Sequence, residues 1–282
     1  MVPTCEREAE LAACLEALAP RRLQPVPGGC EVIVTDDGAG GAEGQRAERF
    51  PAVRFVRGPR RGPAANRNHG ASLATGEWLA FVDDDCLPSP GWLAGFAAMA
   101  ARRPEAQVLE GRTLATGTRI AADMEAPVNA DGGFLWSCNF AIRRELFASL
   151  QGFDEQFPGP VMEDVELRQR LRERGIESVF VPDALVHHPW RRRKGRAFLR
   201  QYAASVDHYL TRHPGQAGFF TIRRSLRNLA GSLARLGREA IRQRRMRGLP
   251  RHAGLEIYRC LLLTAGALRR RRARSQALAS PR

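Results

Sequence analysis

Two groups of aspartates follow apolar stretches in the first third of the chain. Asp83, Asp84 and Asp85 come directly after WLAFV, and Asp36 and Asp37 come directly after EVIVT. Short apolar runs of this kind predict buried strands, and in parallel sheets ligands bind beyond the carboxyl ends of the strands. If the two strands are neighbours, five carboxylates meet at one edge and repel one another. A divalent cation relieves that repulsion, and carboxylate oxygens are suitable ligands for Mg²⁺ or Mn²⁺.

The alternative interpretation is that these acids only solvate the strand ends and cap the next helix. Three consecutive aspartates favour the cation, because adjacent carboxylates repel one another unless a positive charge lies among them. The sequence has no Cys and His pairs near either group, which argues against a zinc site.

The elements that must position these acids lie in the first 190 residues, where short β-like runs alternate with helical stretches. We expect strands at 29–38, 52–58 and 77–85, a short helix at 68–76, and a further helix that starts at Ser89-Pro90. Strands that alternate with helices predict an α/β fold with a Rossmann-type, mostly parallel sheet flanked by helices on both faces.

The charge of the chain is divided unevenly. Its net charge is +14, from 44 basic and 30 acidic residues. Residues 191–282 hold 24 of the basic residues and three of the acids, so this part carries +21 and residues 1–190 carry −7. Apolar residues recur at helical spacing between Phe219 and Ile241, and a second apolar stretch at 255–272 ends in four arginines. We therefore predict an α/β domain at 1–190 and a basic α-helical C-terminal extension at 191–282.

Several longer segments carry a recognisable order of motifs. They are VPTCEREAELAACLEAL (2–18), VIVTDDG (32–38), GPAANRNHGASLATGEWLAFVDDD (62–85), CNFAIRRELFASLQGFDEQF (138–157), MEDVELRQRLRERG (162–175) and VPDALVHHP (181–189). In this order they resemble the family 2 glycosyltransferases, nucleotide-sugar-dependent enzymes with the GT-A fold. The resemblance implies a GT-A-like catalytic domain over residues 1–190. It departs at the first strand, where two residues precede the Pro-Thr pair: either the true start lies upstream, or this wall of the nucleotide pocket is shortened.

The resemblance implies that the aspartates bind the sugar donor and its cation. Asp85 is expected to bind the metal of the family's D-x-D motif, and Asp83 to contact the ribose or the metal through water. Asp84 is expected to line the same substrate site. Asp37, with Asp36 beside it, is expected to contact the base or the ribose of the nucleotide.

The resemblance also implies roles for residues outside the acidic groups. Pro3 and Thr4 are expected to line the nucleotide pocket through backbone atoms. Arg67 is expected to neutralise phosphate or orient the acids, the alternative being a structural ion pair. His188 is expected to reach the metal or the diphosphate, and Trp136 to stack on a sugar; ordinary structural roles are the alternative for both.

Asp164, with Glu163 beside it, matches the family's catalytic acids and would act as the general base. The pair begins a helical stretch, EDVELRQRLRERG, where the helix N-terminus favours the ionised form and a pKa near the reference value of about 3.9. Direct attack of an acceptor hydroxyl would invert the anomeric carbon. The alternative is that both residues are ordinary acids of a helix N-terminus.

The function implied is that of an inverting, metal-assisted hexosyltransferase that moves a sugar from a nucleotide-sugar donor to a saccharide or lipid-linked acceptor, as in cell-envelope polysaccharide biosynthesis. Two alternatives stay open. Clustered acids that bind metals also serve nucleotidyltransferases. A degenerate, non-catalytic glycosyltransferase-like protein could instead dock to membrane or nucleic acid through the Arg-rich tail.

The pattern of the basic extension predicts amphipathic helices that lie on an anionic membrane surface. A packed helical appendage with a solvated arginine face is the alternative, and nucleic-acid binding is disfavoured because the tail has no basic motif interleaved with aromatics. The chain has six scattered cysteines without a C-x-x-C pair, a polar N-terminus and no apolar stretch long enough to span a bilayer. These features predict a cytoplasmic protein, and the basic helices predict that it is peripheral on the inner face of the cell membrane.

Overall fold

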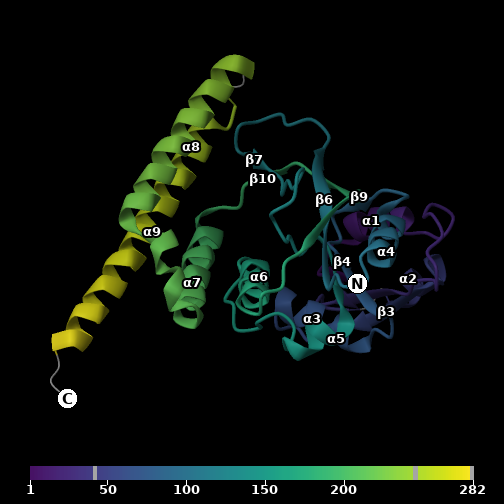
Figure 1. The fold of residues 1–282 in the computed structure, drawn as a ribbon. Helices are drawn as coiled ribbons and strands as arrows, with labels where there is room; N and C mark the ends of the chain where they lie inside the picture. The colour runs from purple at the N-terminus through teal and green to yellow at the C-terminus, as the bar shows by residue number, and fades with distance from the viewer. Residues whose placement is uncertain (41–42, 244–246, 280–282) are drawn as a thin grey trace. The chain divides into compact units, whose positions relative to one another are not determined.

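The computed structural model describes residues 1–40, 43–243 and 247–279, and the chain forms two compact units. The first unit comprises Met1–Gly117 and Ala126–Pro189, and the second comprises Thr118–Glu125 and Trp190–Arg282 (Figure 1). The segment Thr118–Glu125 joins the second unit because its strand β7 (Met124–Glu125) pairs antiparallel with β10 (Arg191–Arg192). Such long-range pairing has no signal in the local sequence.

The first unit opens with a parallel sheet in the order β1-β2-β3. Its strands are β1 (Val2–Thr4), β2 (Val32–Asp36) and β3 (Val53–Arg57), and the helices after them are α1 (Glu8–Ala17), α2 (Glu43–Arg49) and α3 (Pro63–Leu73). Thr4 and Asp36 are register partners at the ends of their strands, and the next amide, that of Asp37, donates to the Thr4 carbonyl at 3.0 Å. Parallel pairing thus brings the ends of β1 and β2 to one edge.

A second sheet of the same unit has the order β4-β8-β6-β9-β5. Its strands are β4 (Trp78–Val82), β5 (Leu87–Pro88), β6 (Val108–Thr116), β8 (Asn139–Arg143) and β9 (Val179–Pro189), and its helices are α4 (Trp92–Arg102), α5 (Arg144–Ser149) and α6 (Glu163–Glu173). Only β6 and β9 pair in parallel here. The Val82 amide donates to the Met1 carbonyl at 3.2 Å, which joins β4 to β1. The α/β prediction is confirmed, with parallel pairing concentrated in the N-terminal half.

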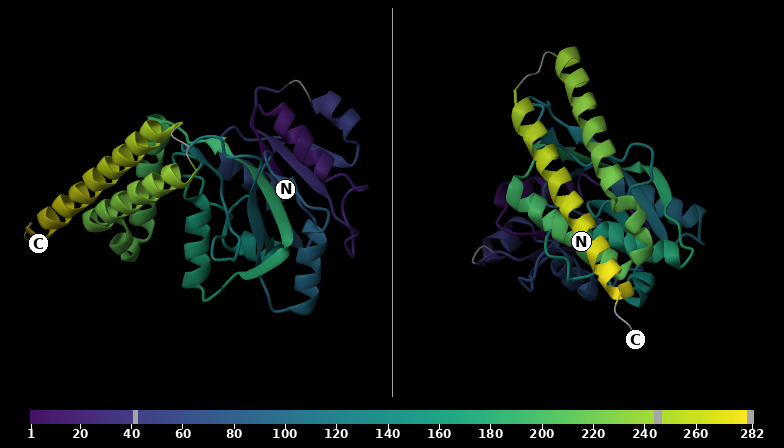
Figure 2. Two further views of the ribbon diagram at one scale, coloured as in Figure 1. Left: turned by 90° about the horizontal axis from the view of Figure 1, so that it is seen from above. Right: turned by 90° about the vertical axis from the view of Figure 1, so that its left-hand side faces the viewer.

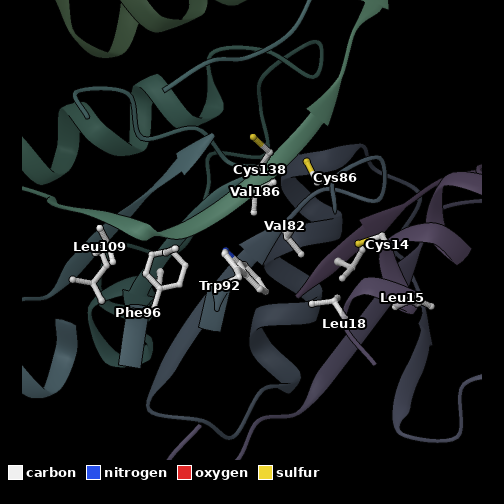
Figure 3. Close-up of a cluster of buried hydrophobic side chains, with 14 of the residues drawn as sticks. Cys14, Leu15, Leu18, Val82, Cys86, Trp92, Phe96, Leu109, Cys138 and Val186 are labelled. Atoms are coloured by element: carbon white, nitrogen blue, oxygen red, sulfur yellow. The ribbon is translucent and has the colours of Figure 1, made fainter. Parts of the chain in front are cut away.

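Two buried clusters hold these strands in place. One gathers apolar side chains from α1, β4, α4, β6 and β9, including Leu15, Val82, Trp92 and Val186 (Figure 3). The other contains four phenylalanines, and within it the rings of Phe81 and Phe140 stack with centroids 4.9 Å apart. Because β4 contributes to both clusters, the acidic residues that follow it start from a fixed strand end.

The second unit consists of α7 (Arg196–Arg212), a 3₁₀ helix (Pro214–Phe220), α8 (Ile222–Gln243) and α9 (Leu249–Ala279). Helix α9 contacts both α7 and α8, and the two long helices run side by side (Figure 2). Glu256 on α9 is buried between Arg193 and Arg259, with N–O distances of 2.6 and 2.7 Å, and these hydrogen-bonded ion pairs outweigh burial and lower its pKa to about 2. Among the described residues, no helix has the length and apolar character needed to cross a bilayer.

Candidate active site

The turn that carries the three aspartates lies between β4 and β5, and the pairing of β5 with β9 determines which side chain it meets. Leu87 is the register partner of His187, so the preceding residues of the turn lie beside the end of β9. As a result the Nε2 atom of His188 is 3.3 Å from the Oδ1 atom of Asp85. Cys86 between these elements is fully buried in the apolar cluster, which anchors the turn.

Asp84 points into the protein and ties the turn to β1. Its carboxylate accepts hydrogen bonds from the hydroxyl of Thr4 at 2.7 Å and from the guanidinium of Arg7 at 2.9 Å. Arg7 also donates to Asp85 at 3.0 Å. Burial raises the pKa of Asp84 to about 6. Asp84 therefore links strand β1 to the turn. The expectation that Asp84 contacts the substrate stays a prediction.

Asp83 faces a buried arginine on α3. Arg67 donates to Asp83 at 2.6 Å and to Glu163 at 3.1 Å, and its side chain is 6% exposed. Burial disfavours its charge, but attraction by both carboxylates outweighs this effect and raises the pKa of Arg67 above its usual value. The guanidinium thus joins the acidic turn to the start of α6.

The start of α6 carries the two acids predicted to be catalytic. Met162, the residue before the helix, has a left-handed backbone (φ 81°), and Glu163 and Asp164 form the first turn. The amides of Ser137 and Val165 donate to Asp164 at 3.4 and 2.8 Å. Burial raises the pKa of Asp164 despite these bonds. The expectation that the helix N-terminus holds this pKa near its reference value was therefore wrong, because desolvation dominates.

A hydrogen-bonded loop supports the start of α6. The side chain of Asn68 on α3 pairs with the backbone of Phe153, donating to its carbonyl at 2.9 Å and accepting from its amide at 2.8 Å. Arg170 on α6 donates to the carbonyl of Gly152 at 2.7 Å and forms an ion pair with the fully buried Glu166. The loop before α6 is thus held between α3 and α6.

His188 provides the structural test for a cation site. Its ring is fully buried, and its Nδ1 atom lies 2.8 Å from the Pro189 carbonyl, which can only accept a hydrogen bond. Nδ1 is therefore protonated, and in the neutral ring the Nε2 lone pair faces Asp85 with no hydrogen-bond partner among the described residues. A lone pair 3.3 Å from a carboxylate oxygen is repelled by it, and either a proton on Nε2 or a divalent cation between the two atoms removes this repulsion. The donor set fits a divalent cation.

The Cys86 thiol completes a group of three possible ligands, with donor atoms of Asp85, Cys86 and His188 within 4.8 Å of one another. The sequence has no Cys and His pair near the acids, and the fold brings Cys86 and His188 together beside Asp85. A hydrogen bond with Cys138, together with burial, raises the pKa of the Cys86 thiol well above its usual value. Mg²⁺ and Mn²⁺ prefer oxygen to sulfur ligands, so the carboxylate of Asp85 is a better ligand for them than the Cys86 thiol.

The second acidic strand end, at β2, makes its own set of hydrogen bonds. Asp36 accepts from the Gly38 amide at 2.8 Å and from Arg46 at 2.5 Å. Asp37 accepts from the amides of Arg60 and Gly62 at 2.8 and 3.2 Å. Pro3 and Thr4 lie beside them on β1, and the Thr4 carbonyl already accepts from Asn66 at 3.2 Å as well as from Asp37. Backbone contacts from Thr4 to a nucleotide stay a prediction.

Trp136 belongs to an aromatic pair next in sequence to Ser137, whose amide contacts Asp164, one of the two acids predicted to be catalytic. Its ring stacks on Phe134, with centroids 5.3 Å apart and planes 4° from parallel, and Phe134 is 51% exposed. The next residue, Ser137, is the one whose amide contacts Asp164.

Sequence reasoning missed Arg7, Phe134 and Ser137 as site residues. Phe134 and Ser137 lie close to Trp136 in the sequence, and this proximity could have identified them. No local sequence pattern indicated that Arg7 would contact the aspartates.

Glu163 gives a testable pH dependence. Burial, followed by repulsion from Asp164, raises its pKa from 4.5 to about 7, so the folded state keeps a proton that the unfolded state loses. Glu163 thus stabilises the fold fully below about pH 4.5, and this contribution is lost as the pH rises through about 7. We expect Glu163→Gln to gain stability over the wild type by roughly 1–3 kcal/mol between about pH 5 and about pH 8, as urea unfolding in EDTA would show.

The matched control is Glu145→Gln, an exposed glutamate in the first turn of α5. Its unfolding free energy should follow the wild type at every pH. Parallel curves for Glu163→Gln and the wild type would contradict the assignment of a protonated buried Glu163.

Comparison with known proteins relates this chain to glycosyltransferases. Residues 1–121 match the family described as Glycosyl transferase family 2. A relative named pre-mycofactocin glycosyltransferase, from Mycobacterium tuberculosis, is 30% identical over 216 residues, covering 69% of this chain and 45% of the relative. The succinoglycan biosynthesis protein ExoM of Rhizobium meliloti is 31% identical over 199 residues, covering 65% of this chain and 64% of the relative. The chain therefore spans about half to two thirds of the length of these relatives.

Among solved structures, the mannosyltransferase PcManGT from Pyrobaculum calidifontis, in complex with GDP-Man and Mn²⁺, matches with a TM-score of 0.63. The match covers 95% of this chain and 85% of that one at 16% identity, which supports the fold alone. The motif order, the fold and the family match agree, and the chain carries a family 2 glycosyltransferase domain with the GT-A fold.

Proposed function

We propose that the chain transfers a sugar from a nucleoside diphosphate sugar to an acceptor hydroxyl, with inversion at the anomeric carbon. The observation that carries this proposal is the guanidinium of Arg67, which contacts Asp83 at 2.6 Å and Glu163 at 3.1 Å. Arg67 thus joins the turn that precedes the candidate cation ligand Asp85 to the first turn of α6, which also carries the candidate base Asp164. A nucleotidyltransferase needs no second acidic group of this kind.

In the proposed reaction Asp164 acts as general base. As the acceptor oxygen forms its bond to the anomeric carbon, Asp164 takes the hydroxyl proton, and the bond from that carbon to the diphosphate breaks. The nucleoside diphosphate leaves with the bonding electron pair. The raised pKa of Asp164 suits this role, because a stronger base takes the proton more readily in the transition state.

Asp85 and His188 are the residues that would hold a divalent cation, and Asp83 lies beside them in the turn. When bound, Mn²⁺ or Mg²⁺ would neutralise the charge that develops on the departing diphosphate. Asp36, Asp37, Pro3 and Thr4 would contact the base and ribose. The stacked rings of Trp136 and Phe134 would offer an apolar face to the acceptor sugar, consistent with a saccharide acceptor in polysaccharide biosynthesis.

Asp164→Asn tests the base directly. We expect it to slow nucleoside diphosphate release from a UDP-, GDP- or dTDP-sugar by about 10²–10⁴-fold, because Asn cannot accept the proton. Binding of the nucleoside diphosphate should stay unchanged. Asp85→Asn should instead lose cation-dependent nucleotide binding, and Asp183→Asn, an exposed aspartate on β9, serves as the control.

Product analysis separates the other functions. Release of sugar 1-phosphate from the nucleotide sugar, or of pyrophosphate from a nucleoside triphosphate supplied with sugar 1-phosphate, indicates nucleotidyl transfer and rejects the proposal. A wild type that neither binds nor cleaves any nucleotide sugar indicates a degenerate domain. Equal rates for Asp164→Asn and the wild type would reject Asp164 as the base.

We also propose that the second unit contacts an anionic membrane surface, which would place the protein on the inner face of the cell membrane near a lipid-linked acceptor. Ile257, Leu261 and Leu268 lie on one face of α9 at helical spacing and are 44%, 62% and 43% exposed. Four arginines at 269–272 follow them. Exposed apolar residues next to basic ones suit the boundary between anionic headgroups and acyl chains.

Vesicle sedimentation tests this contact. The wild type should bind vesicles that contain phosphatidylglycerol and not those of phosphatidylcholine alone, and added salt should weaken the binding. The double variant Ile257→Gln, Leu261→Gln should bind at least about tenfold more weakly, because two apolar side chains lose their burial. Equal binding by this variant would contradict the proposed face, and competition by RNA would favour nucleic acid.

A further inference from the structure

Arg7 contacts the acidic turn and remains partly exposed. It directly precedes α1, and its Nη1 atom lies 2.9 Å from Asp84 and 3.0 Å from Asp85. Its side chain is 39% exposed. One nitrogen of Arg7 thus bridges two adjacent carboxylates from the solvent side.

The other arginine of the site is bound differently. Arg67 is 6% exposed and is fixed between Asp83 and Glu163, two carboxylates from distant parts of the chain. Its departure would leave both carboxylates without that shared positive charge. Arg7 is 39% exposed and contacts only carboxylates of the acidic turn in the ion pairs described, so its charged group can reach solvent more easily than that of Arg67. Of the two arginines, Arg7 is the better suited to exchange partners.

Asp85 is where Arg7 and a cation would compete. The same carboxylate faces His188 at 3.3 Å through one oxygen and Arg7 at 3.0 Å through the other. A divalent cation held by Asp85 and His188 would repel a guanidinium at this short distance. A diphosphate bound beside that cation would attract it, because guanidinium groups form strong paired hydrogen bonds with phosphate oxygens.

We propose that Arg7 is an exchangeable counter-ion of the donor site. It holds Asp84 and Asp85 together while no cation is present, and it moves to the diphosphate of the donor when cation and donor bind. This inference rests on the proposed function, since it assumes a cation and a nucleoside diphosphate at the same turn. It implies that the cation binds weakly alone and tightly together with the nucleotide.

The test uses Arg7→Met, which keeps the apolar stem and removes the charge. In the absence of nucleotide, this variant should bind Mn²⁺ about three- to tenfold more tightly than the wild type, because the competing charge is gone. The affinity is measured by EPR, which detects free Mn²⁺ during a titration. Binding of UDP or GDP at saturating Mn²⁺ should become about tenfold weaker, because a charge-assisted contact is lost. The thermal midpoint of the metal-free protein should fall.

Two further variants sharpen the result. Arg7→Lys should restore part of the nucleotide affinity, because a point charge replaces the paired donors. Arg21→Met removes an exposed arginine that pairs with Glu16 and controls for net charge, so both affinities should match the wild type.

The outcomes distinguish this inference from the proposed function. If the wild type binds both ligands and Arg7→Met changes neither affinity, or weakens Mn²⁺ binding, the counter-ion role is overturned and the proposed function stands. If the wild type binds neither Mn²⁺ nor any nucleoside diphosphate, the proposed function fails and this inference fails with it.

Discussion

The buried guanidinium of Arg67 is the interaction on which the rest of the site depends. It lies between Asp83 and Glu163, and Glu163 is 96 residues away from it in the sequence. The end of β4 and the start of α6 both carry acids, so they would repel one another without a positive charge between them. Asn68 and Arg170 complete the arrangement by holding the loop before α6. One buried cation therefore allows two acidic elements to approach each other.

The charges of the site remain unbalanced after this contact. Five carboxylates surround two guanidinium groups, and burial raises the pKa of Asp84, Glu163 and Asp164. This excess of negative charge lowers the stability of the fold, and groups that are unfavourable for stability are common at functional sites. It also creates the attraction for a divalent cation and the basicity that proton transfer needs. Stability and function therefore oppose each other at the same side chains.

The sequence was most informative where a local pattern determines the structure. Apolar runs that end in acids correctly predicted β2 and β4, and helical periodicity predicted α8 and α9. Patterns of this kind could not predict that Asp84 points inward to Thr4, or that Arg7 reaches the turn, because those contacts join residues about 80 positions apart. Nor could they predict the pKa of Asp164, which depends on burial by the whole fold.

The proposed chemistry of the site depends on a cation held between Asp85 and His188, and pulsed EPR of bound Mn²⁺ tests this most directly. We predict that Mn²⁺ bound together with a nucleoside diphosphate shows the nitrogen coupling of one imidazole, because Nε2 of His188 faces the site with its lone pair. His188→Gln should remove that coupling. Bound Mn²⁺ without any nitrogen coupling in the wild type would contradict the proposed ligands and, with them, the arrangement of charge described for the site.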